Sequence, residues 1–124
     1  MPYEVHVYSD KRLVEVRTTG MVTDDDVIGI DNRMRSDPSI TPDFNQLVDA
    51  GETSEADFSS AGVLEITSRE PFFSTASRRA IVAPTDAGFG MSRMFELYRG
   101  NVAGEIQVFR TRTEALAWLG VSLE

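Results

Sequence analysis

Alternating apolar and polar positions open the chain and predict a β-hairpin. In residues 3–8, YEVHVY, the odd-numbered positions are tyrosine or valine, and the even-numbered positions are glutamate, histidine and tyrosine. Alternation of this kind is typical of a half-buried strand. A second alternating run, LVEVRTT in residues 13–19, follows the polar link SDKR. Because the link is short, we expect the two strands to pair as a hairpin, with Gly20 ending the second strand.

Three further strands and four helices follow from the periodicity of the remaining chain. Helical spacing of apolar residues predicts the helices, and capping signals such as Thr23 with Asp26 mark where they begin. Prolines and glycines mark where they end. The predicted helices lie within residues 23–37, 58–70, 87–99 and 111–120. The predicted strands cover residues 44–50, 79–83 and 105–109, and residues 51–57 (GETSEAD) are predicted to form a loop.

The resulting element order is β-β-α-β-α-β-α-β-α. A hairpin followed by alternating strands and helices predicts an α/β fold with a mixed, mostly parallel sheet. A length of 124 residues suits one domain with one hydrophobic core. We therefore expect a single domain over residues 1–124.

Composition narrows the range of partners and compartments. The chain has no cysteine, which excludes disulfides, thiolate metal sites and a thiol nucleophile. With 12 basic and 20 acidic residues, its formal net charge is -8. A negative potential repels phosphate backbones and anionic lipids, so we expect no nucleic-acid partner. No signal-peptide pattern opens the sequence and no apolar run could span a bilayer, so we expect a cytoplasmic protein without membrane insertion.

Three stretches resemble a known family of α/β domains. They are QLVDA in residues 46–50, RAIVAPTDAGFGMSRMFE in residues 79–96 and VFRTRTEALAWLG in residues 108–120. With the element order, they resemble STAS domains, the anti-sigma-factor-antagonist-like fold. The chain looks most similar to the short stand-alone proteins called STAS-like or CRAL-TRIO-related. The resemblance covers nearly the whole chain and implies a binding or regulatory module without a catalytic signature.

The phosphorylation motif of the family is altered in this sequence. STAS antagonists carry Asp-Ser-Ser/Thr-Gly at the start of the second helix, and a partner kinase phosphorylates the first serine. The matching stretch here is ADFSSAG, in which Asp57 fits the motif and Phe58 stands in place of that serine. Ser59 fits the next position, and a shift of one residue would bring it into the switch position. We expect Ser59 and Ser60 to act as helix caps.

Two glycines, Gly88 and Gly90, lie where the third predicted helix begins. The sequence GFG matches neither the phosphate-binding P-loop pattern nor the dinucleotide-binding pattern. An apolar stripe of Met91, Met94, Phe95 and Tyr98 follows at helical spacing, chiefly as core. Gly90 lies at the edge of this stripe, so we expect it to mark a close contact, and we expect Gly88 to supply backbone freedom in the turn.

A small-molecule site is predicted where strands end and helices begin. In open α/β sheets, ligands lie beyond the carboxyl ends of the strands, and helix N-termini there can hold an anion. The predicted ligand-binding residues are Asp49, Phe58, Ser59, Ser60, Asp86, Gly88, Phe89, Gly90 and Arg93. An alternative site for an apolar or acyl ligand lies between the second and third helices, near Phe58, Phe72, Phe73 and Phe89.

Metal and catalytic sites are not indicated. The run Asp24 to Asp26 is typical of the first turn of a helix, where negative charge is favourable, and its side chains diverge. His6 is the single histidine of the chain, and no motif ties a serine or carboxylate to it. We therefore predict no catalytic residue, no metal site and no cofactor, and we expect that the protein is not an enzyme.

Self-association is a further expectation from the aromatic loop. Phe72 and Phe73 follow Pro71 in a predicted loop, and Leu97 widens the apolar stripe of the third helix. We predict a homodimer in which these three side chains form the contact, whereas a loop folded over the core would leave a monomer. The function predicted from the sequence is a non-enzymatic cytoplasmic binding or regulatory module with an unidentified protein partner. The alternative is a carrier or sensor of a small apolar or acyl ligand.

Overall fold

A computed structural model describes residues 2–57, 59–100 and 104–123 of the chain. Its strands form one sheet in the order β1-β2-β3-β4-β5. β1 pairs antiparallel with β2, and the other neighbouring strands pair parallel. The predicted α/β class and mixed, mostly parallel sheet are therefore confirmed. The strands are β1 (Tyr3–Tyr8), β2 (Leu13–Thr23), β3 (Asn45–Asp57), β4 (Arg78–Val82) and β5 (Glu105–Phe109).

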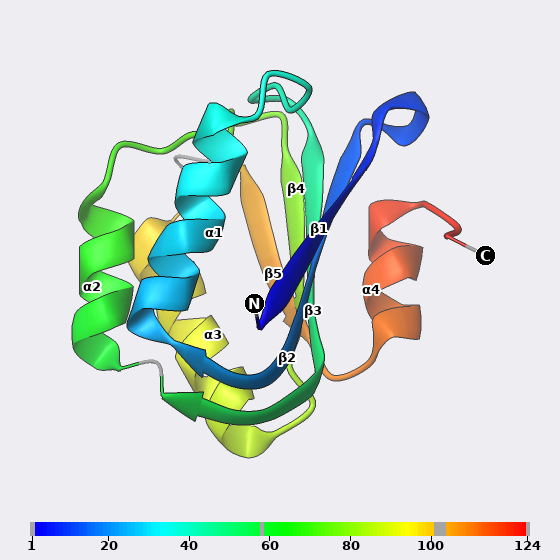
Figure 1. The fold of residues 1–124 in the computed structure, drawn as a ribbon. Helices are drawn as coiled ribbons and strands as arrows, with labels where there is room; N and C mark the ends of the chain where they lie inside the picture. Colours follow the sequence, from blue (N-terminus) through cyan, green and yellow to red (C-terminus); the bar gives the residue numbers. More distant parts are fainter. Residues whose placement is uncertain (1, 58, 101–103, 124) are drawn as a thin grey trace.

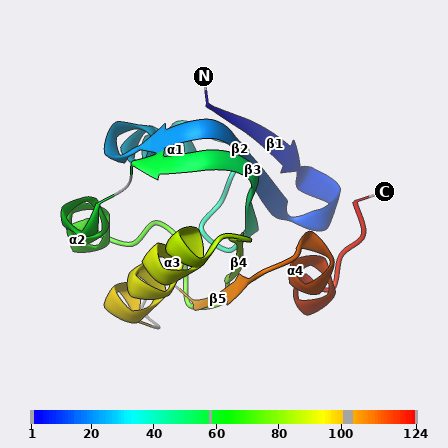
Figure 2. The same cartoon turned by 90° about the horizontal axis from the view of Figure 1, so that it is seen from below.

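The helices cover the two faces of the sheet unequally. Three of them lie on one face, and α4 lies alone on the other (Figures 1 and 2). A short 3-10 turn, η1 (Ser9–Lys11), joins β1 to β2 and ends at Arg12, whose backbone is left-handed with φ of 49°. The helices are α1 (Asp24–Ser36), α2 (Ser60–Ser68), α3 (Asp86–Arg99) and α4 (Arg112–Leu119).

Threonine caps begin three of the helices, and two of them, Thr23 and Thr111, are predicted from the sequence. At α1, the Thr23 hydroxyl accepts the backbone N–H of Asp26, and the Asp26 carboxylate accepts the backbone N–H of Thr23 at 2.9 Å. Thr85 and Thr111 cap α3 and α4 in the same position. Each such cap stabilises its helix by about 1 kcal/mol, because it satisfies N–H groups that have no partner within the helix.

β2 and β3 are longer than the sequence predicts. β2 continues past Gly20 to Thr23, and residues 51–57, which we expected to form a loop, belong to β3. From Gly20 and Thr53 onward, the two ends pair with each other past the ends of β1 and β4. The hydroxyls of Thr18 and Thr53 lie 2.6 Å apart. The β3 end of this ribbon, GETSEAD, is mostly polar, so the periodicity of apolar residues does not reveal it. Register shifts between Arg17 and Thr19 and between Gly20 and Met21, with the positive φ of Gly20 (64°), bend it. Figure 1 shows it curling beneath the helices.

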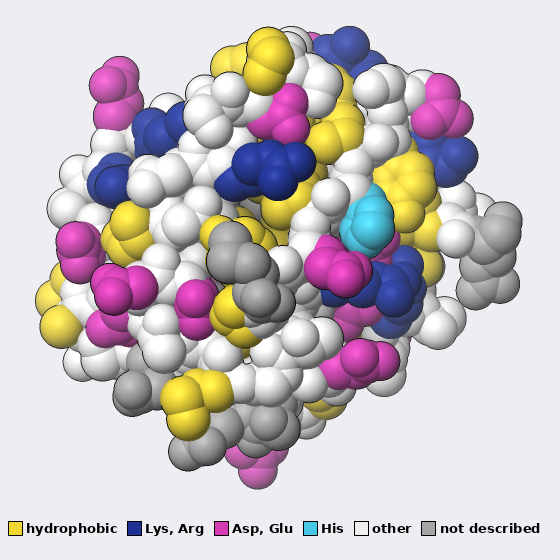
Figure 3. All heavy atoms as spheres, in the orientation of Figure 1, with side chains coloured by type: hydrophobic (Ala, Val, Ile, Leu, Met, Phe, Trp, Pro, Cys, Tyr) yellow, Lys and Arg dark blue, Asp and Glu magenta, His cyan; other side chains and the backbone are white. Residues whose placement is uncertain are grey.

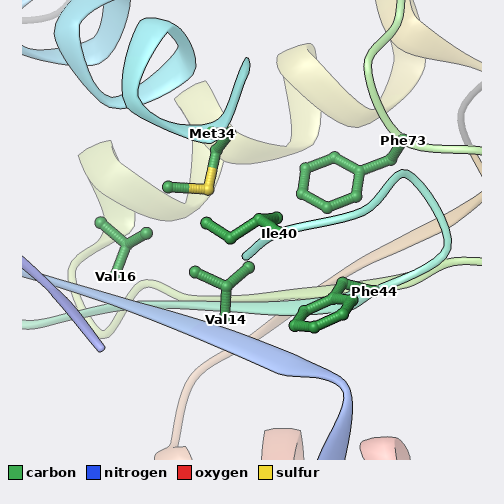
Figure 4. Close-up of a cluster of buried hydrophobic side chains, with 6 residues drawn as sticks. All are labelled: Val14, Val16, Met34, Ile40, Phe44 and Phe73. Carbon is green, nitrogen blue, oxygen red and sulfur yellow. The ribbon is translucent and has the colours of Figure 1, made fainter. Parts of the chain in front are cut away.

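Two hydrophobic clusters lie on opposite faces of the sheet. The cluster under the three helices joins alternate residues of β2 to α1 and to the segments before β3 and β4 (Figure 4). Its buried members are Val14, Val16, Met34, Ile40, Phe44 and Phe73. The cluster under α4 contains Leu13, Leu47, Ala80, Val82, Ala115 and Leu119.

Candidate functional site

A cavity of about 480 Å³ lies between the sheet and the three helices on its more covered face. Its walls are mostly apolar, which follows from the alternation of side chains along the strands. The strands contribute Val48, Ala50 and Ile81; α1 and α3 contribute Val27, Ile30, Met34, Met91 and Phe95; and the segment after α2 contributes Pro71, Phe72 and Phe73.

Arg79 is a charged side chain in this mostly apolar lining. It lies on β4 two residues before Ile81, so both side chains point to the same face. Its Nε donates a hydrogen bond to Oε1 of Gln46 on the neighbouring strand at 3.1 Å. Its guanidinium lies 4.6 Å from the ring centre of Phe73 and 5.5 Å from that of Phe95. These contacts hold the guanidinium in one position against the cavity wall.

Burial, together with the nearby positive charge of Arg99, lowers the pKa of Arg79 to about 10. Arg79 is therefore still protonated at neutral pH. Burying this charge is unfavourable without a partner, and the ring faces of two phenylalanines offset only part of that penalty.

Two further charged residues reach the same end of the cavity. Arg99 donates to the backbone carbonyls of Ile66 at 2.9 Å and Arg69 at 3.1 Å, at the end of α2. The Asp31 carboxylate accepts the Nε of Arg35 and an NH1 of Arg69, both at 2.8 Å. The arginines at this end therefore outnumber the carboxylates that line it.

Few of the predicted ligand-binding residues lie at this cavity. Gly88 lines it, as do Phe72 and Phe73, which we had placed at the alternative apolar site and at a dimer interface. The cavity therefore overlaps the position predicted between the second and third helices, although α1 and the sheet form the remaining walls. Phe58 lies outside the described residues.

Asp49 lies on the opposite face of the sheet. The sequence places it at the end of a strand, but β3 continues to Asp57, so Asp49 is a mid-strand residue. As the neighbour of Val48, which faces the cavity, it points toward α4 and accepts an NH1 of Arg112 at 2.7 Å.

The remaining predicted residues of the turn and of α3 lie outside the cavity lining. Arg110 stacks over the Phe89 ring at 4.2 Å and pairs with Asp86 at 2.9 Å. Arg93 is exposed and pairs with Glu96 at 3.0 Å, one helical turn further on. These side chains, which were predicted to bind a ligand, instead form ion pairs or stacking contacts with other residues of the protein.

The two glycines of this turn differ in their surroundings. Gly88 faces the Thr85 hydroxyl, which would lie 2.9 Å from a Cβ, so the helix cap explains this glycine. Nothing lies within 4 Å of a Cβ built at Gly90, which is exposed. The expectation that Gly90 marks a close contact is therefore wrong: the apolar stripe turns away from it.

The predicted anion site at the start of α2 is filled by the protein itself. Ser59 caps this helix, since its hydroxyl accepts the Gly62 N–H at 3.0 Å, whereas Ser60 is the first helical residue. The Asp24 carboxylate accepts both the N–H and the hydroxyl of Ser59, at 2.9 and 2.8 Å. Gly62 allows this approach, because a Cβ there would overlap that carboxylate.

Phe73 is also placed differently from the predicted interface. It is only 5% exposed and belongs to the core, and its ring packs edge-on against Phe72. The loop after α2 therefore folds back over the core, which leaves Phe73 unavailable to a second chain. Leu97, in contrast, is 70% exposed on α3.

A second polar cluster, which the sequence did not reveal, lies on the face of α4. Glu15 is only 1% exposed, although it occupies the middle of β2. It accepts hydrogen bonds from Arg17 Nε at 3.0 Å, from the Tyr8 hydroxyl at 3.2 Å and from Arg112. Burial raises the pKa of Glu15, but the hydrogen bonds from the two arginines outweigh burial, so the pKa lies below its ordinary value.

Arg79 and Gln46 were likewise missed as site residues. The sequence contained one signal for them: Arg79 lies two positions before Ile81, and Gln46 lies two positions before Val48, so each shares a strand face with an apolar residue.

His6 lies at the surface, where its ring is 3.4 Å from Glu4. Figure 3 shows the histidine in cyan beside charged side chains. In the described ranges, no group of three or more His, Asp or Glu side chains could hold a metal ion. Within the same ranges, no helix has both the length and the apolarity to cross a membrane.

Comparison with known proteins identifies the fold. No protein-family model and no curated protein matches the sequence. Among solved structures, the chain is similar to an uncharacterised protein of the DUF3478 family from Shewanella loihica PV-4, described as having a SpoIIAA-like fold. The two superpose with a TM-score of 0.58 and 19% sequence identity, over 94% of this chain and 91% of the other. The STAS-like resemblance of the sequence is therefore confirmed at the level of architecture: this chain has a SpoIIAA-like fold.

Proposed function

We propose that this chain is a non-enzymatic binding module of the cytoplasm that holds a small, largely apolar molecule, as a carrier or sensor. The observation that supports this proposal is the cavity of about 480 Å³ under the three helices. Small-molecule sites typically have volumes of about 300–1,000 Å³, mostly apolar walls and a few placed polar groups. Val48, Ile81 and Phe95 supply such walls, and Arg79 with Gln46 supplies the polar groups.

An apolar ligand fits this cavity better than a polar one. Each Å² of apolar surface removed from water contributes about 25 cal/mol, whereas a polar group buried without a hydrogen bond is penalised. The aliphatic and aromatic side chains of α1, β3 and α3 offer little hydrogen bonding along most of the cavity. The bound molecule should therefore be apolar over most of its length.

The surroundings of Ser59 and His6 favour binding over catalysis. The Ser59 hydroxyl caps α2 and donates to Asp24, and His6 is an exposed residue next to Glu4. The Ser59 hydroxyl is engaged in these structural hydrogen bonds with Asp24 and Gly62, and neither Ser59 nor His6 lines the cavity. We accordingly propose no reaction for the bound molecule.

A regulatory role through a protein partner is the second candidate. Three large apolar side chains are more than half exposed on α2 and α3: Leu64, Leu97 and Tyr98. Both helices also enclose the cavity, through Ile66 and Phe95. A ligand that changes their packing would therefore reach the surface that a partner could contact.

Native mass spectrometry of freshly purified protein tests the proposal, together with fluorescence titration of N-phenyl-1-naphthylamine, a neutral apolar dye. We expect a co-purified small molecule or saturable dye binding. Ala50→Phe, which places a ring inside the cavity, should abolish dye binding, and Ala76→Phe, at an exposed loop position, should leave it unchanged. Absence of both a bound molecule and dye binding would remove the proposal. A co-purified protein without either would support the second candidate.

A further inference from the structure

We propose that Arg79 is the anchor for a carboxylate, so that the ligand of the cavity is an apolar carboxylic acid with its head group at this arginine. This inference rests on the proposed function, because it assumes that the cavity binds a small molecule. It adds the chemical class of the ligand and the direction in which the ligand lies.

The hydrogen bonds of Arg79 leave most of its donors available. A guanidinium has five N–H donors. In the described part of the chain, Arg79 forms one hydrogen bond, from Nε to Gln46, and no ion pair. The terminal nitrogens carry the remaining four N–H groups, and Arg79 lines the cavity. Two parallel N–H groups of a guanidinium match the two oxygens of a carboxylate.

The charges around this end of the cavity favour an anion. Arg99 also lines the cavity, and its positive charge acts on Arg79, as does that of Arg35. Asp31 lines the same end, but its carboxylate already accepts hydrogen bonds from Arg35 and Arg69. Four arginines thus surround one aspartate, in a chain whose net charge is -8. The local excess of positive charge is the opposite of the overall charge.

The backbone gives the ligand a direction. Arg79 lies near the beginning of β4, and the cavity continues along this strand through Ile81 to Ala83 and Pro84. On the neighbouring strand, Val48 and Ala50 follow Gln46 along the same path. A head group at Arg79 would therefore direct an alkyl chain toward the carboxyl ends of the parallel strands, along an apolar wall.

A purely structural role is the competing explanation for Arg79. Its stacking on Phe73 and Phe95 would then serve to pack the core, and the cavity would show no preference for anions. The two explanations differ in a measurable way, because only a carboxylate anchor distinguishes an acid from the alcohol of the same chain length.

The experiment compares decanoate with 1-decanol in displacing N-phenyl-1-naphthylamine at pH 7.5. For the wild-type protein, we expect half-displacement at a decanoate concentration about ten-fold or more below that of decanol, because a charge-assisted hydrogen bond is stronger than a neutral one. Arg79→Met should abolish this preference while leaving decanol binding in place. Arg79→Lys, which keeps the charge without the planar fork, should show an intermediate preference.

The matched control is Arg93→Met, which removes the same charge from an exposed site on α3 and should keep the full preference. Decanol binding by each variant verifies that its cavity is intact. Equal displacement by decanoate and decanol in the wild type would overturn the carboxylate assignment while the cavity proposal stands, and this comparison needs no variant to fold. Wild-type decanoate affinity in a folded Arg79→Met variant would overturn the role of Arg79. Failure of the wild type to bind the dye or either decyl compound would instead remove the proposed function itself.

Discussion

The carboxylate of Asp24, the first residue of α1, holds the start of α2 through Ser59, 35 residues further along the chain. Oδ1 accepts the Ser59 backbone N–H at 2.9 Å, and Oδ2 accepts its hydroxyl at 2.8 Å. One side chain therefore joins two helices that both enclose the cavity, through Val27 and Ile66.

Replacing Asp24 with alanine should loosen this junction. The Ser59 N–H and hydroxyl would lose their acceptor, which should lower the free energy of unfolding by about 1–2 kcal/mol. Urea denaturation measures the change as a lower midpoint at unchanged slope. Asp25→Ala, at the exposed next position, is the control and should change the free energy by less than about 0.5 kcal/mol. Equal effects of the two substitutions would contradict the role of Asp24.

Gly62→Ala should destabilise the protein even though alanine favours helices. A Cβ at this position would overlap the Asp24 carboxylate, so the carboxylate must move away from Ser59. We expect a loss of about 1–3 kcal/mol, the usual range for overpacking. The double variant with Asp24→Ala should be no less stable than Asp24→Ala alone, since the overlap disappears. Additive losses in this cycle would show that the strain has another origin.

Gly90→Ala should have the opposite effect. Gly90 lies within α3, and nothing lies within 4 Å of its potential Cβ. Alanine in a helix is favoured over glycine by about 0.5–1 kcal/mol, so the variant should unfold at a higher urea concentration than the wild type. Decreased stability would indicate a contact that the structure does not contain.

The contrast between Gly62 and Gly90 shows what the sequence could and could not predict. Periodicity and capping signals act within a few residues, so they located α1 to α4, β4 and β5 within one or two residues, but only the first part of β2 and β3. The crowding at Gly62 comes from Asp24, 38 positions away, and no local pattern reports it. Gly90 looked crowded because it borders an apolar stripe, but helix α3 turns that position to solvent.

The candidate site was harder to predict than the fold for the same reason. Most of the residues that we predicted to bind a ligand were chosen because they follow a strand or begin a helix. The cavity instead lies along the strand faces, where Arg79 and Gln46 alternate with residues of the opposite face. Asp49 does not line the cavity, and it is not at a strand end because β3 extends through a polar segment to Asp57.

Glu15 should make stability depend on pH in the acid range. Although its burial raises the pKa, the hydrogen bonds and charges of Arg112 and Arg17 lower it below the ordinary value of 4.5. The stabilisation is therefore complete above that value and is lost as pH falls through the lowered pKa of the folded state. Glu15→Gln should lower the free energy of unfolding by about 1–3 kcal/mol at pH 7, because two buried charge-assisted hydrogen bonds weaken.

Urea midpoints at pH 7, 5.5 and 3.5 measure how far stability depends on the ionisation of Glu15. All three values lie below the pH range in which Tyr8 or the arginines titrate. The difference between wild type and Glu15→Gln should be constant from pH 7 to 5.5 and should narrow toward pH 3.5. Glu105→Gln, at an exposed position on β5, is the control and should follow the wild type. A difference that stays constant down to pH 3.5 would mean that the Glu15 carboxylate does not titrate in this range.

The predicted homodimer now depends on Leu97 and no longer on Phe73. Leu97 is 70% exposed, with Tyr98 beside it on α3, and an exposed apolar patch is a usual site of contact between identical chains. Leu97→Asp should dissociate a dimer without unfolding the subunit, because the new charge is solvated in the monomer but desolvated in the contact. Phe73→Asp, in contrast, should unfold the chain, since Phe73 is 5% exposed in the core. Sedimentation at micromolar concentration measures dimerisation, and circular dichroism measures folding. Wild-type protein that sediments as a single species of 13.7 kDa would exclude the dimer. A dimer that survives Leu97→Asp would place the contact away from this side of α3.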